Sequence, residues 1–311
     1  MSTWVHSFIL TPSKGDLADS YILQWEKRLD KIFQTSDQSI AVTFSDGTTA
    51  GGTHLVGCDG ARSRVRELLC SLAGNPSHND QLDVRFLGCS VELPSDMVLR
   101  IRQLDPLFLQ AHHSNGSFFF FGIQETPAIN ERGSYRCQVN VSWQYRKGFL
   151  GREHPIEVPK SHADRLALVQ EIASHWTSPF QDIVRSIPTD TPMQEIKLED
   201  WRLASDSGAW ENLRGRATLI GDAAHAMTMY RGEAVNHGIT DVSDLIECYL
   251  HKLGDSEGTL DCQEACDKFE KKMIDRTRIA IRASRQACLD AHYSEKIDKM
   301  SPLVSKRAII A

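Results

Sequence analysis

The sequence predicts an α/β protein in which a parallel-sheet domain is interrupted by an antiparallel-sheet domain of α+β type and ends in a C-terminal helix. Two short apolar strands, Leu55-Val56 and Ala217–Ile220, each lead into a glycine with an acidic residue one or two positions later, where ligands of α/β sheets bind. Four segments between them predict an antiparallel sheet: 84–93, 98–104, 117–123 and 135–145. An apolar stripe over about 258–292 predicts the closing helix.

The composition is that of an ordinary globular chain. Its 311 residues correspond to about two domains, and its 41% apolar and 24% charged residues exclude a disordered or fibrous protein. The net charge of −6, from 35 Lys and Arg against 41 Asp and Glu, argues against nucleic acid as a partner. No run approaches 18 apolar residues and no basic lead-in opens the chain, so we expect no membrane span, no signal peptide and a cytoplasmic location.

A linker signal divides the chain. Residues 73–80 are rich in turn formers, and the apolar period changes after them. We therefore predict one discontinuous domain from residues 1–75 and 202–311, with a second domain, residues 76–201, inserted into it.

Local patterns predict several elements within these domains. Residues 17–33 are expected to form a helix that runs into an extended segment. Asp46-Gly47 predicts a hairpin turn after an alternating strand. Ser161 and Asp164 have the spacing of a capping box, which predicts that a helix begins there.

One candidate site follows the strand at 217–220. Gly221 lets the backbone approach a ligand closely, and the Asp222 carboxylate can accept hydrogen bonds from polyol hydroxyls. Further along, Gly232 precedes Asn236 at the start of a helix, where free N–H groups suit an electron-rich ring edge or an anion. Alternatively, the segment is a plain strand–turn–helix connection in which Asp222 acts only as a cap.

A second candidate site follows the strand at Leu55-Val56. The acid Asp59 lies between Gly57 and Gly60 and can hold loop amides. Three arginines follow it and can bind phosphate oxygens: Arg62, Arg64 and Arg66. The plain alternative is an Asp-Gly turn with solvated arginines.

Together, and in this order around a strand-rich domain, the two motifs resemble those of the class A FAD-dependent monooxygenases, the aromatic-hydroxylase-like family. That family has a GADGxxSxVR segment and a later GDAAHxxxPxxGxGxNxGxxDAxxL segment. The matching segments here are VGCDGARSRVREL and GDAAHAMTMYRGEAVNHGITDVSDL. The closing helix is similar to that of fungal members, which suggests secondary metabolism, and the resemblance covers roughly residues 20–292.

The resemblance implies FAD as cofactor, bound by an incomplete Rossmann-like domain, and it implies roles for individual residues. Asp222, next to Gly221, would bind the ribityl chain of the flavin. Asp59, Gly60 and Arg66 would support the pyrophosphate side and the incoming NAD(P)H. The loop against the isoalloxazine ring would consist of Gly232, Ala234, Val235 and Asn236.

The resemblance also implies the chemistry. NAD(P)H would reduce FAD, O2 would form a flavin hydroperoxide, and this species would hydroxylate or epoxidise a small apolar or aromatic metabolite. Because the flavin supplies the reactivity, we expect neither a catalytic triad nor a metal site. Cys262 and Cys266 stand at i, i+4, but no His or further Cys lies near them in the sequence to complete a tetrahedral set.

The chain departs from the family pattern in three places. No GxGxxG turn occurs in it, so the family's first βαβ segment, on the order of 80–100 residues, is expected to be missing. Met229 replaces the proline and Ala234 the second glycine of the ring loop. Two functions therefore stay open: an FAD-dependent monooxygenase, or an N-terminally truncated, non-catalytic flavoprotein remnant or partner protein.

Four residues are candidates for substrate contacts. Arg102 alternates with apolar neighbours in the predicted inserted sheet, and His112 lies between two predicted strands. Tyr230 and Arg231 belong to the predicted flavin loop and could approach a substrate.

Overall fold

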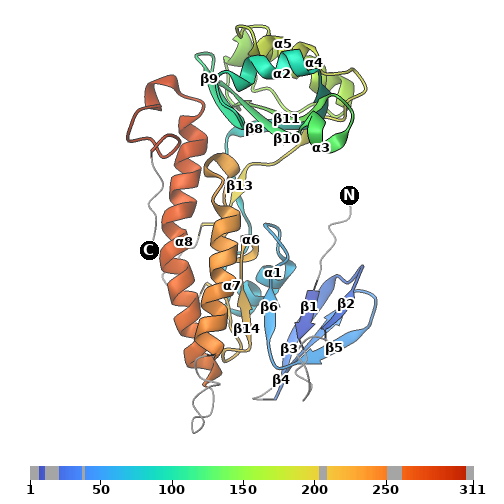
Figure 1. Cartoon of the computed structure of the whole chain (residues 1–311). Helices are drawn as coiled ribbons and strands as arrows, with labels where there is room; N and C mark the ends of the chain where they lie inside the picture. Colours follow the sequence, from blue (N-terminus) through green and yellow to red (C-terminus); the bar gives the residue numbers. More distant parts are fainter. Residues whose placement is uncertain (1–6, 11–20, 37–38, 203–208, 251–260, 306–311) are drawn as a thin grey trace. The chain divides into compact units, whose positions relative to one another are not determined.

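A computed structural model describes residues 7–10, 21–36, 39–202, 209–250 and 261–305. The chain forms two compact units, and the labels of Figure 1 are used for both. The first unit comprises residues 1–80 and 199–285, and the second comprises residues 81–198 and 286–311. Hydrogen bonds within the second unit explain why it includes the end of the long helix: Ser142 Oγ lies 2.9 Å from His292 Nε2, and Gln144 Nε2 donates to the His292 carbonyl at 2.9 Å.

The second unit is built on a five-stranded antiparallel sheet with the order β12–β8–β11–β10–β9. Its strands are β8 (Val84–Leu93), β9 (Phe108–His113), β10 (Ser117–Glu125), β11 (Tyr135–Gln144) and β12 (Gln194–Glu195). The predicted strands at 84–93, 117–123 and 135–145 are confirmed. β9 was not predicted, because its edge position leaves it without a fully buried side chain.

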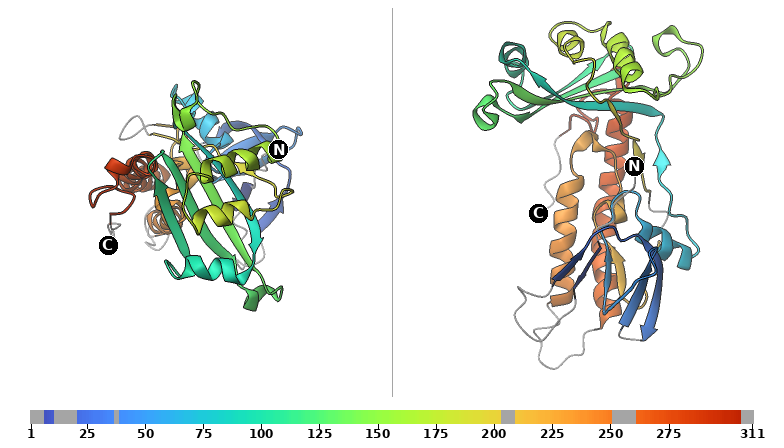
Figure 2. Two further views of the ribbon diagram at one scale, coloured as in Figure 1. Left: turned by 90° about the horizontal axis from the view of Figure 1, so that it is seen from above. Right: turned by 90° about the vertical axis from the view of Figure 1, so that its right-hand side faces the viewer.

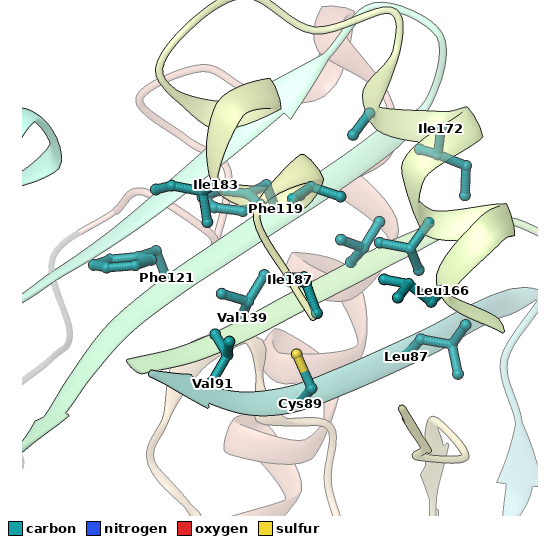
Figure 3. Close-up of a cluster of buried hydrophobic side chains, with 14 of the residues drawn as sticks. Leu87, Cys89, Val91, Phe119, Phe121, Val139, Leu166, Ile172, Ile183 and Ile187 are labelled. Carbon is teal, nitrogen blue, oxygen red and sulfur yellow. The ribbon is translucent and has the colours of Figure 1, made fainter. Parts of the chain in front are cut away.

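Helices cover one face of this sheet. They are α2 (Ser95–Arg102), α4 (His162–Ala173) and α5 (Phe180–Arg185), and Figure 2 shows them on the same side. Phe119 and Val139 point from the strands toward Leu166, Ile172 and Ile183 of the helices (Figure 3). This layer is the core of the second unit.

Shorter elements complete the second unit. They are α3 (Pro127–Asn130), η1 (Phe149–Gly151) and η3 (Ser294–Lys296). The predicted capping box is confirmed, because Ser161 Oγ accepts the Asp164 N–H at 3.1 Å at the start of α4.

The predicted strand over 98–104 is wrong, because most of it lies in α2. Val98 and Ile101, three residues apart, are both buried, whereas Leu99 is 48% exposed. The arginines and apolar residues of this segment therefore belong to an amphipathic helix, and the buried face of this helix packs on the sheet.

Small sheets make up the described strands of the first unit. β1 (Ser7–Leu10) pairs with β2 (Tyr21–Gln24), and β3 (Leu29–Ser36), β4 (Ser39–Phe44) and β5 (Thr49–Gly52) form an antiparallel sheet. β6 (Leu55–Gly57) and β14 (Ala217–Leu219) are parallel, with Leu219 opposite Gly57. The predicted hairpin is confirmed, because Asp46-Gly47 joins β4 to β5 and Gly47 has φ +83°.

Helices and short turns follow the parallel strands. They are α1 (Arg64–Leu72), α6 (Asp222–His225), η2 (Met229–Arg231), α7 (Ala234–Leu250) and α8 (Cys262–Asp290). α7 and α8 run side by side in Figures 1 and 2, and Asp241 and Arg276 bridge them at 2.8 Å. No helix in the described ranges is both long and apolar enough to cross a membrane.

The predicted helix over 17–33 is wrong where the structure describes it. Residues 21–24 form β2, and 29–33 belong to β3, whereas 17–20 lie outside the described residues. β3 pairs with β4 from Leu29 opposite Phe44 onward, and this cross-strand pairing outweighs the local helical spacing.

Polar contacts join the residues just before the inserted segment to the residues just after it. Arg202 Nη2 lies 2.6 Å from Asp80 Oδ2. Asn79 Nδ2 donates to Glu199 Oε2 at 3.4 Å. The short strands β7 (Asp80–Gln81) and β13 (Glu199–Asp200) pair at the same place. The insertion therefore begins and ends at neighbouring points.

A carboxyl group on α8 predicts a pH-dependent stability. Glu270 Oε1 accepts hydrogen bonds from Trp210 Nε1 and Thr218 Oγ1, both at 2.8 Å, and burial raises the pKa of this carboxyl to about 7. An unfolded glutamate ionises near its ordinary pKa, so the folded state binds the proton more tightly. The Glu270 contribution to stability is therefore complete below about pH 4.5 and is lost as the pH rises through about 7, by on the order of 3 kcal/mol.

Denaturant titrations of the protein and of Glu270→Gln between pH 4.5 and 8 test this expectation. The difference in unfolding free energy between them is expected to shift in favour of the variant as the pH rises, because glutamine accepts the same hydrogen bonds without ionising. A difference that stays constant with pH would contradict the raised pKa.

Candidate active site

The two sequence motifs meet at one edge of the parallel strand pair. β6 ends at Gly57, two residues before Asp59, and β14 ends at Leu219, two residues before Gly221 and three before Asp222. Because Leu219 lies opposite Gly57 in a parallel register, both motif turns begin at the same carboxyl edge. This edge is where α/β sheets bind their ligands.

Close packing explains the glycine that ends β6. A Cβ added to Gly57 would lie 2.6 Å from Leu219 Cδ2 and 2.8 Å from Val65 Cβ. The absence of a side chain at this position therefore lets β6, β14 and the start of α1 approach one another.

We expect Gly57→Ala to lower the unfolding free energy by about 1–3 kcal/mol, because overpacking forces neighbouring groups apart. Gly51→Ala in β5 is the matched control, since its nearest atom beyond the chain neighbours, the Ile40 oxygen, would lie 3.8 Å from the new Cβ. Equal Tm values for the two variants would show that the side chains around residue 57 make room for the new Cβ without loss of stability.

Asp59 holds the first turn of α1. Its Oδ2 accepts the N–H groups of Arg64 at 2.7 Å and Val65 at 3.1 Å, and its Oδ1 accepts the Ser63 hydroxyl. Ser63 Oγ in turn accepts the Arg66 N–H at 2.8 Å. The carboxylate thus binds the first N–H groups of α1, and Gly60 beside it has φ +80°.

The Arg66 side chain hydrogen-bonds to residues of both motifs. Its side chain is buried, and its N–H groups reach four carbonyl oxygens and one amide oxygen: Ser77 at 3.1 Å, Asp222 at 3.4 Å, Ala223 at 3.1 Å, Ala61 at 2.7 Å and Asn79 Oδ1 at 2.8 Å. The guanidinium carbon also lies 4.6 Å from the centre of the Trp201 ring. A guanidinium has five N–H groups, so these acceptors account for all of them.

Asp222 differs from Asp59 because its carboxylate has no hydrogen-bond partner within the described ranges, and the residue is exposed. Protein packed around one side of the carboxylate desolvates it and raises its pKa, and the charges of His225 and Arg66 partly offset this rise. Gly221 before it has φ +59°, and no atom of the described residues, apart from its chain neighbours, lies within 4 Å of where its Cβ would be. An acceptor and open space therefore stand together at the end of β14.

The predicted ring loop continues from this turn. Gly232 adopts the left-handed conformation, with φ 61° and ψ 32°, after η2. Ala234, Val235 and Asn236 form the first turn of α7, whose initial N–H groups have no acceptor within the helix. Val235 is 73% exposed, so this helix start is open.

The candidate substrate residues lie in both units. Tyr230 is buried in η2, and Arg231 pairs with Glu233 at 2.9 Å, both in the first unit. Arg102 at the end of α2 donates to the Tyr135 hydroxyl at 2.9 Å in the second unit. His112 on β9 lines a cavity of about 90 Å³ with Ser117 and other residues of the second unit.

Three further residues contribute to the site: Ser77, Asn79 and Asp241. Ser77 and Asn79 belong to the predicted linker, yet both bind Arg66. Asp241 on α7 is fully buried and accepts the Gly221 N–H at 2.7 Å. The signal for Asp241 is the second aspartate of the quoted family segment GDAAHxxxPxxGxGxNxGxxDAxxL, which falls at this residue.

Comparisons with known proteins agree with the motifs. A protein family described as an FAD binding domain matches residues 24–277. The chain is 46% identical to a probable FAD-dependent monooxygenase of the fungus Arthroderma benhamiae, over 94% of this chain and 69% of the relative. It is 34% identical to the FAD-dependent monooxygenase dbaB of Emericella nidulans, over 79% of this chain and 64% of the relative. The chain therefore spans about two thirds of the length of these relatives.

Solved structures share the fold. 2,6-Dihydroxypyridine-3-hydroxylase from Arthrobacter nicotinovorans aligns with a TM-score of 0.66 and 15% identity, over 99% of this chain and 82% of the enzyme. HpxO of Klebsiella pneumoniae, solved with FAD and uric acid, aligns with a TM-score of 0.62 and 19% identity, over 86% of this chain and 58% of that one. Among the described residues, no group of three His, Cys, Asp or Glu could hold a metal ion.

Proposed function

The chain belongs to the FAD binding domain family that includes fungal FAD-dependent monooxygenases, and on this premise we propose that it binds FAD at Asp222 and serves an NAD(P)H- and O2-dependent monooxygenase reaction. The observation that carries the proposal is the exposed Asp222 carboxylate, which has no protein partner in the described ranges, at the carboxyl edge shared by β6 and β14. A carboxylate so placed can accept hydrogen bonds from the hydroxyls of a ribityl chain.

The residues at this edge fit a flavin nucleotide. The open space beside Gly221 and the exposed first turn of α7, with Gly232, Val235 and Asn236, leave room for a ligand at backbone distance. When bound, FAD would take electrons from NAD(P)H and use them to activate O2 for transfer of one oxygen atom to a substrate. The chain itself binds and orients the flavin through Asp222 and the helix start.

Other motif residues are proposed to shape the site rather than to touch the flavin. The hydrogen bonds of Arg66 go to protein oxygens, so its role is to join the first motif to the Asp222 turn. Asp59 and Gly60 fix the turn before α1, which would face the pyrophosphate side and the incoming NAD(P)H.

A small apolar or aromatic molecule is the proposed substrate class. Structural neighbours support it, since one is named a dihydroxypyridine hydroxylase and another was solved with uric acid. Tyr230, Arg231, Arg102 and His112 remain the proposed substrate contacts, and the fungal relatives suggest a secondary metabolite.

Absorbance spectra and oxygen uptake test the proposal. The purified full chain, incubated with FAD and passed through a desalting column, is expected to retain a yellow flavin that appears in solution on denaturation. Addition of NADH or NADPH should then cause oxygen uptake. A colourless protein that takes up no FAD would instead support the second function, a non-catalytic flavoprotein remnant or partner protein.

A further inference from the structure

The carboxylate of Asp241 lies at the junction of three elements of the first unit. Its Oδ2 accepts the backbone N–H of Gly221 at 2.7 Å and lies 2.6 Å from His225 Nε2. Its Oδ1 accepts Arg276 Nη2 of α8 at 2.8 Å. Asp241 and His225 are both fully buried. One side chain of α7 therefore binds the turn after β14, helix α6 and helix α8.

Electrostatics favour the charged form of this carboxylate. Burial alone would raise the pKa of Asp241, but the hydrogen bonds from His225, Gly221 and Arg276 outweigh it and hold the pKa below its usual range. A charged acceptor binds a backbone N–H about twice as strongly as a neutral one does. The Gly221 amide is thus held by a strong bond rather than left to solvent.

The bond to Gly221 matters because it fixes the backbone directly before Asp222. Gly221 has φ 59° and ψ −147°, a conformation that other residues rarely adopt. The Asp222 side chain itself receives no hydrogen bond within the described ranges. Its direction therefore depends on the backbone of the turn.

We propose that Asp241 is a positioning residue, which fixes the Gly221–Asp222 turn so that the Asp222 carboxylate is presented for cofactor binding. The effect on FAD affinity rests on the proposed function. The claim that Asp241 fixes the turn does not. His225 takes part as a second donor to the same oxygen through a proton on Nε2, and its buried Nδ1 has no partner in the described ranges.

Asp244 supplies a matched control. It lies one helical turn further along α7, is nearly buried, and binds the same Arg276 at 3.2 Å. Its other oxygen binds Lys272 of α8 at 2.7 Å, whereas the other oxygen of Asp241 binds the Gly221 turn. Both Asp241→Ala and Asp244→Ala therefore remove an ion pair between α7 and α8. Only Asp241→Ala also removes the hydrogen bond to the Gly221 turn.

Hydrogen exchange at the Gly221 amide tests whether Asp241 fixes the turn, and it requires no cofactor. Asp241→Ala is expected to speed exchange there by about 10- to 100-fold, since a bond to a charged group is lost. Asp244→Ala should leave that amide protected. Asp241→Asn should keep most of the protection, because its amide oxygen can still accept the N–H. Equal exchange in Asp241→Ala and the parent, or equal acceleration in Asp244→Ala, would overturn the proposal.

FAD titration then tests the consequence. Asp241→Ala is expected to raise the FAD dissociation constant by about 10-fold or more relative to Asp244→Ala, with Asp241→Asn between them and near the parent. If the parent binds no FAD, the proposed function fails while the exchange result still decides the role of Asp241. If Asp241→Ala does not fold, Asp241→Asn and Asp241→Ser replace it in the same comparison. Equal affinity of a folded Asp241→Ala and the parent would contradict the consequence.

Discussion

Asp222→Ala is expected to weaken FAD binding by about 10- to 100-fold, because the variant loses an ionised acceptor whose hydrogen bonds contribute about 1.5–3 kcal/mol. The stability of the protein should change little, since the Asp222 carboxylate is exposed and binds no other group in the described part of the chain. The measurement is a titration of flavin fluorescence, with a thermal unfolding curve of each variant without FAD.

Asp222→Asn separates the two properties of the carboxylate. The amide keeps one acceptor oxygen and loses the charge, so an affinity between those of the parent and the alanine variant is expected. Unchanged affinity in Asp222→Ala, with an unchanged unfolding curve, would show that the flavin is not held at this residue.

Arg66→Met is expected to cause the largest loss of stability, about 3 kcal/mol or more, because it leaves buried oxygens of both motif turns without donors. The five acceptors belong to the linker, the first motif and the turn after β14. Chemical denaturation gives the unfolding free energy directly. A Tm lower by several degrees should accompany it.

Arg62→Met is the matched control for this variant. Arg62 comes from the same motif, but its side chain is 60% exposed and forms one ion pair, with Glu199 at 3.2 Å. An exposed pair contributes about 0–1 kcal/mol, so the Arg62 variant should remain close to the parent. Equal losses in the two variants would mean that water replaces the guanidinium of Arg66 without cost.

The positions of the two motif turns could be predicted from the sequence better than some local elements could. Gly57, Asp59, Gly221 and Asp222 have recognisable types at fixed places after two strands, and the parallel register of β6 and β14 places both turns at one edge. The alternation of apolar residues was also sufficient to predict strand β11. Every second residue of this strand belongs to the core of the second unit.

The failures have a common physical cause. The segments at 17–33 and 98–104 were assigned from local spacing, but pairing with β4 and packing on the five-stranded sheet decide their structures. The expectation that Arg66 supports the pyrophosphate side stays a prediction; the acceptors that surround its guanidinium could not be predicted, because they come from segments far apart in the sequence. Asp241 was not singled out because its bond to Gly221 joins residues of two different elements.

The contacts at the two ends of the inserted segment have a consequence for how such proteins diversify. Asp80 and Arg202 bridge the exit and entry points, as do Asn79 and Glu199. A different sheet placed between Gln81 and Leu198 would begin and end at the same neighbouring points, and the hydrogen bonds of Arg66 and Asp241 would be kept. It would lose the contacts of β11 with His292, so an exchange of the insertion also has to replace the chain after α8.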